Sequence, residues 1–177
     1  MEPLAAHQRA QEVFAGVLAG VEPGQLDDPT PCTEWAVREL IDHVIAGNNG
    51  VAGERSSGSG DDLVAAHAAS AERAQAAFAA PDGMDRGFDL PFGTVPGRVF
   101  VGMRTTEVLT HAWDLARATG QPTDLDPELA VAMLEQARQG VQPEFRGPGR
   151  PFGQEQDCPP DRSAEDQLAA CLGRPVD

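Results

Sequence analysis

Two short stretches, about sixty residues apart, carry the side chains of this chain that are best suited to hold a metal ion. His43 lies in the first stretch, and Glu107 and His111 lie in the second. Glu107 and His111 are four residues apart, so on a helix both side chains leave the same face, one turn apart. Together with His43 from another helix they supply two imidazoles and one carboxylate. This is the ligand set of an open catalytic zinc site, in which a fourth position is left for water or substrate.

A further carboxylate follows this set. Asp114 comes three residues after His111 and lies on nearly the same helical face. We expect Asp114 to orient the imidazole of His111 through its second nitrogen, or to act as a catalytic general base at the open position. Zinc suits the donors, and nickel, iron and manganese are alternatives, because ligand type alone does not select the metal. The competing interpretation is a structural helix whose Glu and His side chains are solvated.

The remaining histidines, the tryptophans and one cysteine are weaker candidates. His7 is expected to be exposed near the start of the first helix, and His67 lies on an alanine-rich helix; either is an alternative fourth ligand. Cys32 directly precedes an expected helix start, where the helix dipole lowers the pKa of a thiol. A small packed cysteine is the favoured interpretation of Cys32. Trp35 and Trp113 are expected in the core, with the wall of a pocket as the alternative.

The spacing of apolar residues predicts the elements that must position these groups. We expect helices over residues 3–21, from Thr33 to 47–53, from 61–62 to 79, from 94–97 to 120, over 126–140, and a short one within 163–173. Thr33, Asp126 and Ser163 are the expected N-caps. Residues 88–93 are expected to be irregular, with extended stretches as the alternative. Residues 141–162 are expected to be irregular and residues 56–60 to form a flexible linker, and no strand is assigned. The expected fold is all-α: one domain over 1–177, an antiparallel four-helix bundle with additional short C-terminal helices.

Composition limits the function classes. The chain has 177 residues and a net charge of −15, which disfavours nucleic acid as a partner. No apolar run is long enough to span a membrane, and no signal segment is recognised at the N-terminus. Three scattered cysteines do not form a disulfide scaffold, so a cytoplasmic location is expected. The chain contains no lysine, which excludes Schiff-base chemistry and a phosphate-loop lysine.

Several motifs, taken in order, resemble a known family. They are Thr30-Pro31-Cys32-Thr33-Glu34-Trp35, Leu40-x-x-His43, Leu90-Pro91-Phe92-Gly93, the run from Glu107 to Gly120, the run from Arg146 to Gly153, and Leu172-Gly173-Arg174. In this order they resemble the DinB-like metal-binding superfamily. Within it they are similar to the N-terminal domain of mycothiol-dependent maleylpyruvate isomerase and its short actinobacterial relatives. The resemblance covers nearly the whole chain.

The resemblance implies a four-helix bundle that holds a divalent metal, usually zinc, through His43, Glu107 and His111. It also implies mycothiol as a candidate thiol cofactor, whose sulfur takes the open metal position. A metal-bound thiol loses its proton readily, because the cation stabilises the thiolate. The isomerase carries a second domain that contributes an arginine to the active site, and no such domain is expected within these 177 residues. Arg104 and Arg117, near the motif, are the candidates to replace that arginine.

The expected function is therefore a metal-dependent, thiol-using S-transferase or isomerase that acts on a small electrophilic substrate. Its expected partners are a small-molecule thiol and the substrate, with no nucleic acid and no membrane; a homodimer is among the expected assemblies. The first alternative is a non-catalytic bundle that binds a metal or small ligand. The second is a purely structural bundle.

Overall fold

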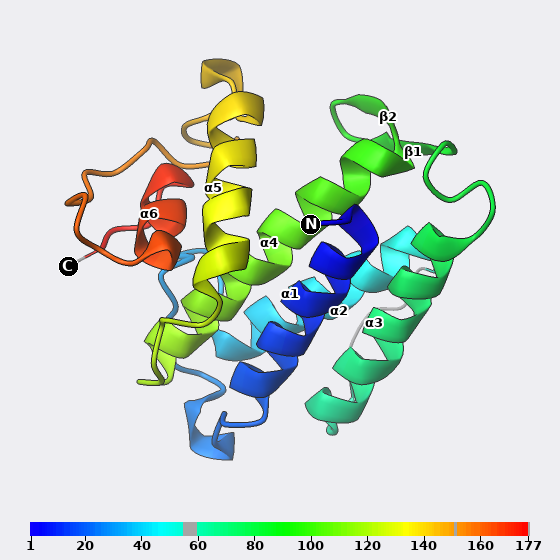
Figure 1. The fold of residues 1–177 in the computed structure, drawn as a ribbon. Helices are drawn as coiled ribbons and strands as arrows, with labels where there is room; N and C mark the ends of the chain where they lie inside the picture. Colours follow the sequence, from blue (N-terminus) through cyan, green and yellow to red (C-terminus); the bar gives the residue numbers. More distant parts are fainter. Residues whose placement is uncertain (55–59, 151, 177) are drawn as a thin grey trace.

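A computed structural model describes residues 1–54, 60–150 and 152–176, so all of the expected linker over 56–60 except Gly60 lies outside the described residues. The described part is mostly helical, with one small two-stranded sheet (Figure 1). Its elements are α1 (Pro3–Leu18), η1 (Pro23–Gln25), α2 (Val37–Val51), α3 (Leu63–Ala79), β1 (Gly87–Leu90), β2 (Gly93–Pro96), α4 (Gly97–Ala118), α5 (Pro127–Gly140), η2 (Pro143–Phe145) and α6 (Ala164–Cys171). No helix within these ranges is long and apolar enough to cross a lipid bilayer.

The two helices that carry the candidate ligands pack against each other. α4 is the longest helix, and it contacts α1, α2, α5 and α6 (Figure 1). α3 lies against α1 and α2, while α5 and α6 pack together on the other side of the molecule. The main core is formed by apolar side chains at helical spacing, among them Phe14, Leu40, Ile41, Leu109 and Leu115, all almost completely buried. Burial of these stripes fixes the rotation of α2 and α4 about their axes.

Most of the expected helix ends are confirmed. The side chains of Asp62, Asp126 and Ser163 each accept a hydrogen bond from the backbone N–H three residues further on, as N-caps do. Gly120 follows the end of α4 with a φ of +69°, the left-handed conformation that commonly ends a helix. Capping residues and terminal glycines act within a few residues of the helix end, so the sequence alone can predict them.

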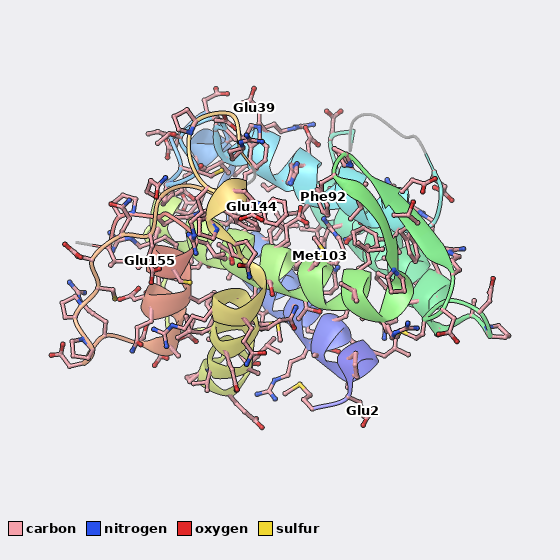
Figure 2. All side chains as sticks on the ribbon, turned by 90° about the horizontal axis from the view of Figure 1, so that it is seen from above. Glu2, Glu39, Phe92, Met103, Glu144 and Glu155 are labelled. Atoms are coloured by element: carbon pink, nitrogen blue, oxygen red, sulfur yellow. The ribbon has the colours of Figure 1, made fainter. Side chains whose placement is uncertain are left out.

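The segment before α4 differs from the all-α expectation. Residues 87–90 and 93–96 form an antiparallel hairpin, and α4 follows it from Gly97, within the expected start over 94–97. Phe88 of this hairpin is buried in a small apolar cluster with Phe78, and this tertiary contact stabilises strands too short to show an alternating pattern. At the tip, the Phe92 ring lies 5.9 Å from that of Phe145 in η2. Figure 2 shows Phe92 and Glu144 on the same side of α4.

The start of the second helix is also corrected. α2 begins at Val37 with Ala36 in the N-cap position, and residues 31–34 form a bend followed by a turn, so Thr33 is not the N-cap. The hydroxyl of Thr30 donates to the carbonyls of Cys32 and Trp35, at 3.0 and 2.8 Å, and holds this turn closed. Such a side-chain bond competes with helix formation. Cys32 therefore does not lie at a helix N-terminus.

Candidate metal centre

The structure brings the three expected metal ligands together. His43 is on α2, and Glu107 and His111 are on α4; one donor atom from each lies within 4.8 Å of the other two. His43 Nε2 is 2.8 Å from Glu107 Oε1. Donor atoms that share a tetrahedral zinc ion are about 3.3 Å apart, given bonds of about 2.0–2.1 Å. Small side-chain adjustments would therefore let these donors share one ion, and their role as ligands stays a prediction.

The site is closed on one side and open on the other. His111 is 5% exposed, whereas the side chains of His43 and Glu107 are 36% and 31% exposed. The indole of Trp35 stacks on the His43 ring, with centroids 4.1 Å apart and planes at 27°. Trp35 thus forms a wall of the site. The half-exposed edge at His43 and Glu107 is the side from which a small molecule can approach.

Glu107 is held in its ionised form. Burial by itself would raise the pKa of this carboxyl, but the Arg104 guanidinium and the hydrogen bond with His43 outweigh it and bring the pKa well below its usual range. A ligand that is already deprotonated binds a cation without competition from a proton. Glu107 is therefore ready to coordinate at neutral pH.

Asp114 lies behind His111, away from the open edge. Its Oδ2 is 3.0 Å from His111 Nδ1, and its side chain is completely buried. Arg174 donates from Nε to Oδ1 at 3.2 Å and from Nη2 to Oδ2 at 3.0 Å. Burial acts to raise the pKa of Asp114, but the bonds and charges of His111 and Arg174 lower it overall. Of the two expected roles, orientation of His111 agrees with these contacts; that of general base stays a prediction.

Two arginines lie beside the site, and the sequence indicated only one of them. Arg104, one of the two candidates, contacts Glu107 through a 2.6 Å ion pair. Arg117, the other, lies over the ring of Trp113, with Cζ 5.5 Å from the centroid, and is exposed. Arg174 comes from the segment after α6, sixty residues from its partner Asp114. No periodicity or local motif links residues so far apart, so Arg174 could not be identified from spacing.

Two glycines allow the C-terminal segment to reach the site. Gly173 has a φ of +95°, and a Cβ there would lie 2.5 Å from the Cα of Gly153. Arg146 holds the same crossing from the side, because its Nη1 donates to the carbonyl of Cys171 at 2.6 Å. The close backbone contact therefore requires glycine and places Arg174 next to α4.

A second group of donors shares His111. Cys32, His111 and Asp114 also have donor atoms within 4.8 Å of one another. This group suits a cation less well, because Arg174 already neutralises Asp114 and repels a second positive charge. Burial, the largest influence, raises the pKa of the Cys32 thiol, so it is not activated as a ligand or a nucleophile.

Neither remaining histidine belongs to a donor group formed by the described residues. His7 and His67 are almost completely buried, so the expected exposure of His7 is wrong. His7 Nδ1 lies 2.8 Å from Gln75 Oε1, and His67 Nε2 lies 3.0 Å from Gln11 Oε1. Amide partners from other helices satisfy these imidazoles and permit their burial.

The burial of His67 predicts a loss of stability in mild acid. Burial lowers the pKa of His67 to about 4 from 6.5, so between these values the unfolded chain binds a proton that the folded chain does not. His67 should therefore reduce the free energy of unfolding by about 3 kcal/mol in total as the pH falls from 6.5 to 4. Urea unfolding at several pH values measures this loss.

The matched variant is His67→Gln, whose amide does not titrate. Its free energy of unfolding should change less than that of the wild type between pH 6.5 and 4. The pKa values of Glu107 and Asp114 are lowered from 4.5 and 3.8, so their contributions to stability begin to fall only near and below pH 4.5, and they fall equally in both proteins. Parallel curves for wild type and variant down to pH 4 would contradict the assignment to His67.

Comparison with known proteins relates the chain to one group. Residues 7–60 match the family model of the mycothiol maleylpyruvate isomerase N-terminal domain. An uncharacterized protein of Mycobacterium tuberculosis, found in two strains, is 58% identical over 181 residues, which cover 99% of this chain and 100% of the relative. A crystal structure of a histidine-to-alanine mutant of the mycothiol-dependent maleylpyruvate isomerase matches with a TM-score of 0.61 and 21% identity, covering 80% of this chain and 72% of that chain. At that identity the likeness concerns the fold.

Proposed function

The chain belongs to the same family as the Mycobacterium tuberculosis protein, a family related to the N-terminal domain of mycothiol-dependent maleylpyruvate isomerase, and on this premise we propose that it binds a divalent metal and uses a small thiol. The proposed activity is S-transfer to, or isomerisation of, a small electrophilic molecule, with mycothiol as the candidate thiol and zinc as the preferred metal. The observation that supports it is the convergence of donor atoms from His43, Glu107 and His111.

Each residue of the site has a definable task in this proposal. His43, Glu107 and His111 would hold the ion, and Asp114, fixed by Arg174, keeps the His111 ring in one orientation and tautomer. A divalent cation at this position would make an approaching thiol more acidic. The thiol sulfur would then add to an electrophilic carbon while a π bond of that carbon opens, and the thiol proton would pass to the atom at the other end of that bond. In an isomerisation, the sulfur and a proton would leave again after rotation about the new single bond.

The finer features of the fold belong to the same proposal. α1 contacts α3 and α4, and α2 contacts the same two helices, which supports a DinB-like four-helix bundle built from α1 to α4. Under this proposal, α5 and α6 are added to the four-helix bundle. Residues 1–177 then form a single domain. The proposed setting is the cytoplasm, with a homodimer as the assembly to be tested.

Metal analysis tests the binding site directly. After purification and dialysis against zinc, wild-type protein should carry one zinc ion per chain, measured by elemental analysis. His43→Ala and Glu107→Gln should lose this zinc, because each removes a donor from the proposed group. Cys32→Ser is the matched control: it alters only the second donor group and should keep the metal. Zinc that is lost in Cys32→Ser but kept in His43→Ala would place the ion in the second group and contradict the proposal.

A non-catalytic binding protein is the second candidate, and one observation favours it. Asp114 is the expected acid–base residue, yet it is completely buried and both of its oxygens are engaged by Arg174. A thiol and a chromogenic electrophile, incubated with zinc-loaded protein, separate the two candidates. Faster conjugation than in the His43→Ala variant supports the enzyme. If the zinc-loaded wild type conjugates the electrophile no faster than the His43→Ala variant does, the binding protein is supported.

A further inference from the structure

We propose that Arg104 and Gly47 act together as positioning residues that reserve a single oxygen of Glu107 for the metal. Arg104 occupies one carboxylate oxygen, so that an ion can be bound through the other oxygen alone. This inference rests on the proposed metal binding and adds a specific role for two residues outside the donor set. It predicts how the site keeps a coordination position free for a thiol.

The two oxygens of Glu107 have different partners. Arg104 Nη1 lies 2.6 Å from Oε2, whereas Oε1 lies 2.8 Å from Nε2 of the proposed ligand His43. Arg104 is one turn before Glu107 on α4, and its side chain is only 4% exposed. The pair is partly buried, because the arginine is shielded while the Glu107 side chain is 31% exposed, and solvent screens such a pair less than a surface pair. Oε2 is therefore engaged before any cation arrives.

The guanidinium of Arg104 is itself fixed from α2. Its Nη2 donates to Asn48 Oδ1 at 3.1 Å and lies 3.4 Å from the carbonyl of Val44. Asn48 is completely buried and is held in turn by Gln11 of α1, which donates to the same Oδ1 at 2.8 Å. Three helices thus determine where the Arg104 guanidinium lies. A surface ion pair formed by chance would not be held in this way.

Gly47 provides the space for the guanidinium. It lies in the middle of α2, and a Cβ at this position would come within 2.6 Å of Cζ of Arg104. Glycine inside a helix costs about 1 kcal/mol relative to alanine. At Gly50, one turn later on the same helix, a Cβ would meet no other atom within 4 Å. Of these two helical glycines, only Gly47 must lack a side chain for the Arg104 guanidinium to fit.

Burial of this arginine also leaves one of its donors unsatisfied among the described residues. Nε of Arg104 is buried and has no hydrogen-bond partner within the described part of the chain. A buried charged donor without a partner lowers the stability of a fold. A role at the site explains why such an unfavourable group lies beside Glu107.

The consequence concerns the coordination of the ion. A free carboxylate can bind a cation through both oxygens, and this fills two positions. With Oε2 bonded to Arg104, Glu107 donates Oε1 only, and a position stays open for the sulfur of a thiol. If Arg104 is removed or displaced, the carboxylate can bind through both oxygens. The metal should then bind as tightly or more tightly, because Glu107 supplies a second oxygen and, where Arg104 is removed, a nearby positive charge is gone. The thiol should bind more weakly, because the second oxygen fills the position that its sulfur would take.

Cobalt as the probe metal and 2-mercaptoethanol as the probe thiol test this inference. Co²⁺ in the site reports its binding through visible absorption, and a bound thiolate adds a sulfur-to-cobalt charge-transfer band in the near ultraviolet. In Arg104→Met and Gly47→Ala, Co²⁺ should bind at least as tightly as in the wild type. Half-saturation by 2-mercaptoethanol should require about tenfold more thiol, the lower end of the effect of residues that support a ligand. Gly50→Ala is the matched control and should behave as the wild type.

The outcomes separate this inference from the function on which it rests. Failure of the wild type to bind Co²⁺ would remove the proposed metal site and this inference with it. Normal Co²⁺ binding with an unchanged thiol response in both variants would overturn the inference alone. A parallel loss of Co²⁺ and thiol binding would indicate a merely structural role and would also overturn it. If Arg104→Met does not fold, Gly47→Ala alone decides, because it displaces the guanidinium from Glu107 without removing its charge.

Discussion

Replacement of His111 by alanine is expected to lower the affinity of the protein for zinc by more than about 100-fold, beyond the range found for residues that only support a ligand. His111 is the one residue common to both donor groups that the described residues form. Its loss therefore leaves neither group complete, whereas His43→Ala and Cys32→Ser each spare one. Because the His111 side chain is buried, no solvent-facing group can take its place. Competition with a chelating indicator measures the affinity.

Two comparisons make this expectation specific. His67→Gln removes a histidine that belongs to neither donor group, and it should keep the wild-type affinity for zinc. The loss in His43→Ala should be nearly as large as that in His111→Ala if the ion lies between α2 and α4. Wild-type affinity in His111→Ala would mean that zinc binds elsewhere on this acidic chain, and the proposed site would be abandoned.

Part of the convergence of the three donors was foreseeable, because that part depends on the geometry of each single helix. Glu107 and His111 share a face of α4 through their spacing alone. His43 sits beside Val44 and Ile41, whose burial fixes the rotation of α2 and leaves the imidazole at the edge of the stripe. What the sequence did not contain is the packing of α2 on α4, and the resemblance to a known family supplied that expectation.

The features that were missed depend on contacts between distant segments. The hairpin over residues 87–96 is stabilised by Phe88 packing on Phe78, and four-residue strands are too short for a periodic signal. Burial of His7 needs an amide partner from α3, which no local pattern indicates. Arg174 reaches the site only because the chain crosses itself at two glycines. Each of these is a tertiary contact that overrides a local preference.

Removal of the carboxylate behind His111 should strongly destabilise the fold. In Asp114→Ala, the guanidinium of Arg174 loses both carboxylate oxygens that accept its hydrogen bonds, while its side chain is only 13% exposed. Breaking a buried pair by removing one partner costs about 3–5 kcal/mol, and the slight exposure of Arg174 places the expected loss near 3 kcal/mol. Urea unfolding of the metal-free protein measures it. The zinc affinity should fall as well, by about 10–100-fold, because the His111 ring loses its orienting partner.

A double-mutant cycle shows whether the pair acts as a unit. Arg174→Met alone leaves the Asp114 carboxylate completely buried and without its cation, so it should destabilise to a similar degree. In the double variant neither charge is left unpaired, and the total loss should be smaller than the sum of the two single losses by about 2–3 kcal/mol. Arg117→Met is the control, because that exposed arginine only covers the ring of Trp113 and should cost about 0.5–1 kcal/mol. Strictly additive losses would show that the C-terminal segment is held by its backbone crossing at Gly153 and Gly173, and that Arg174 does not secure it to α4.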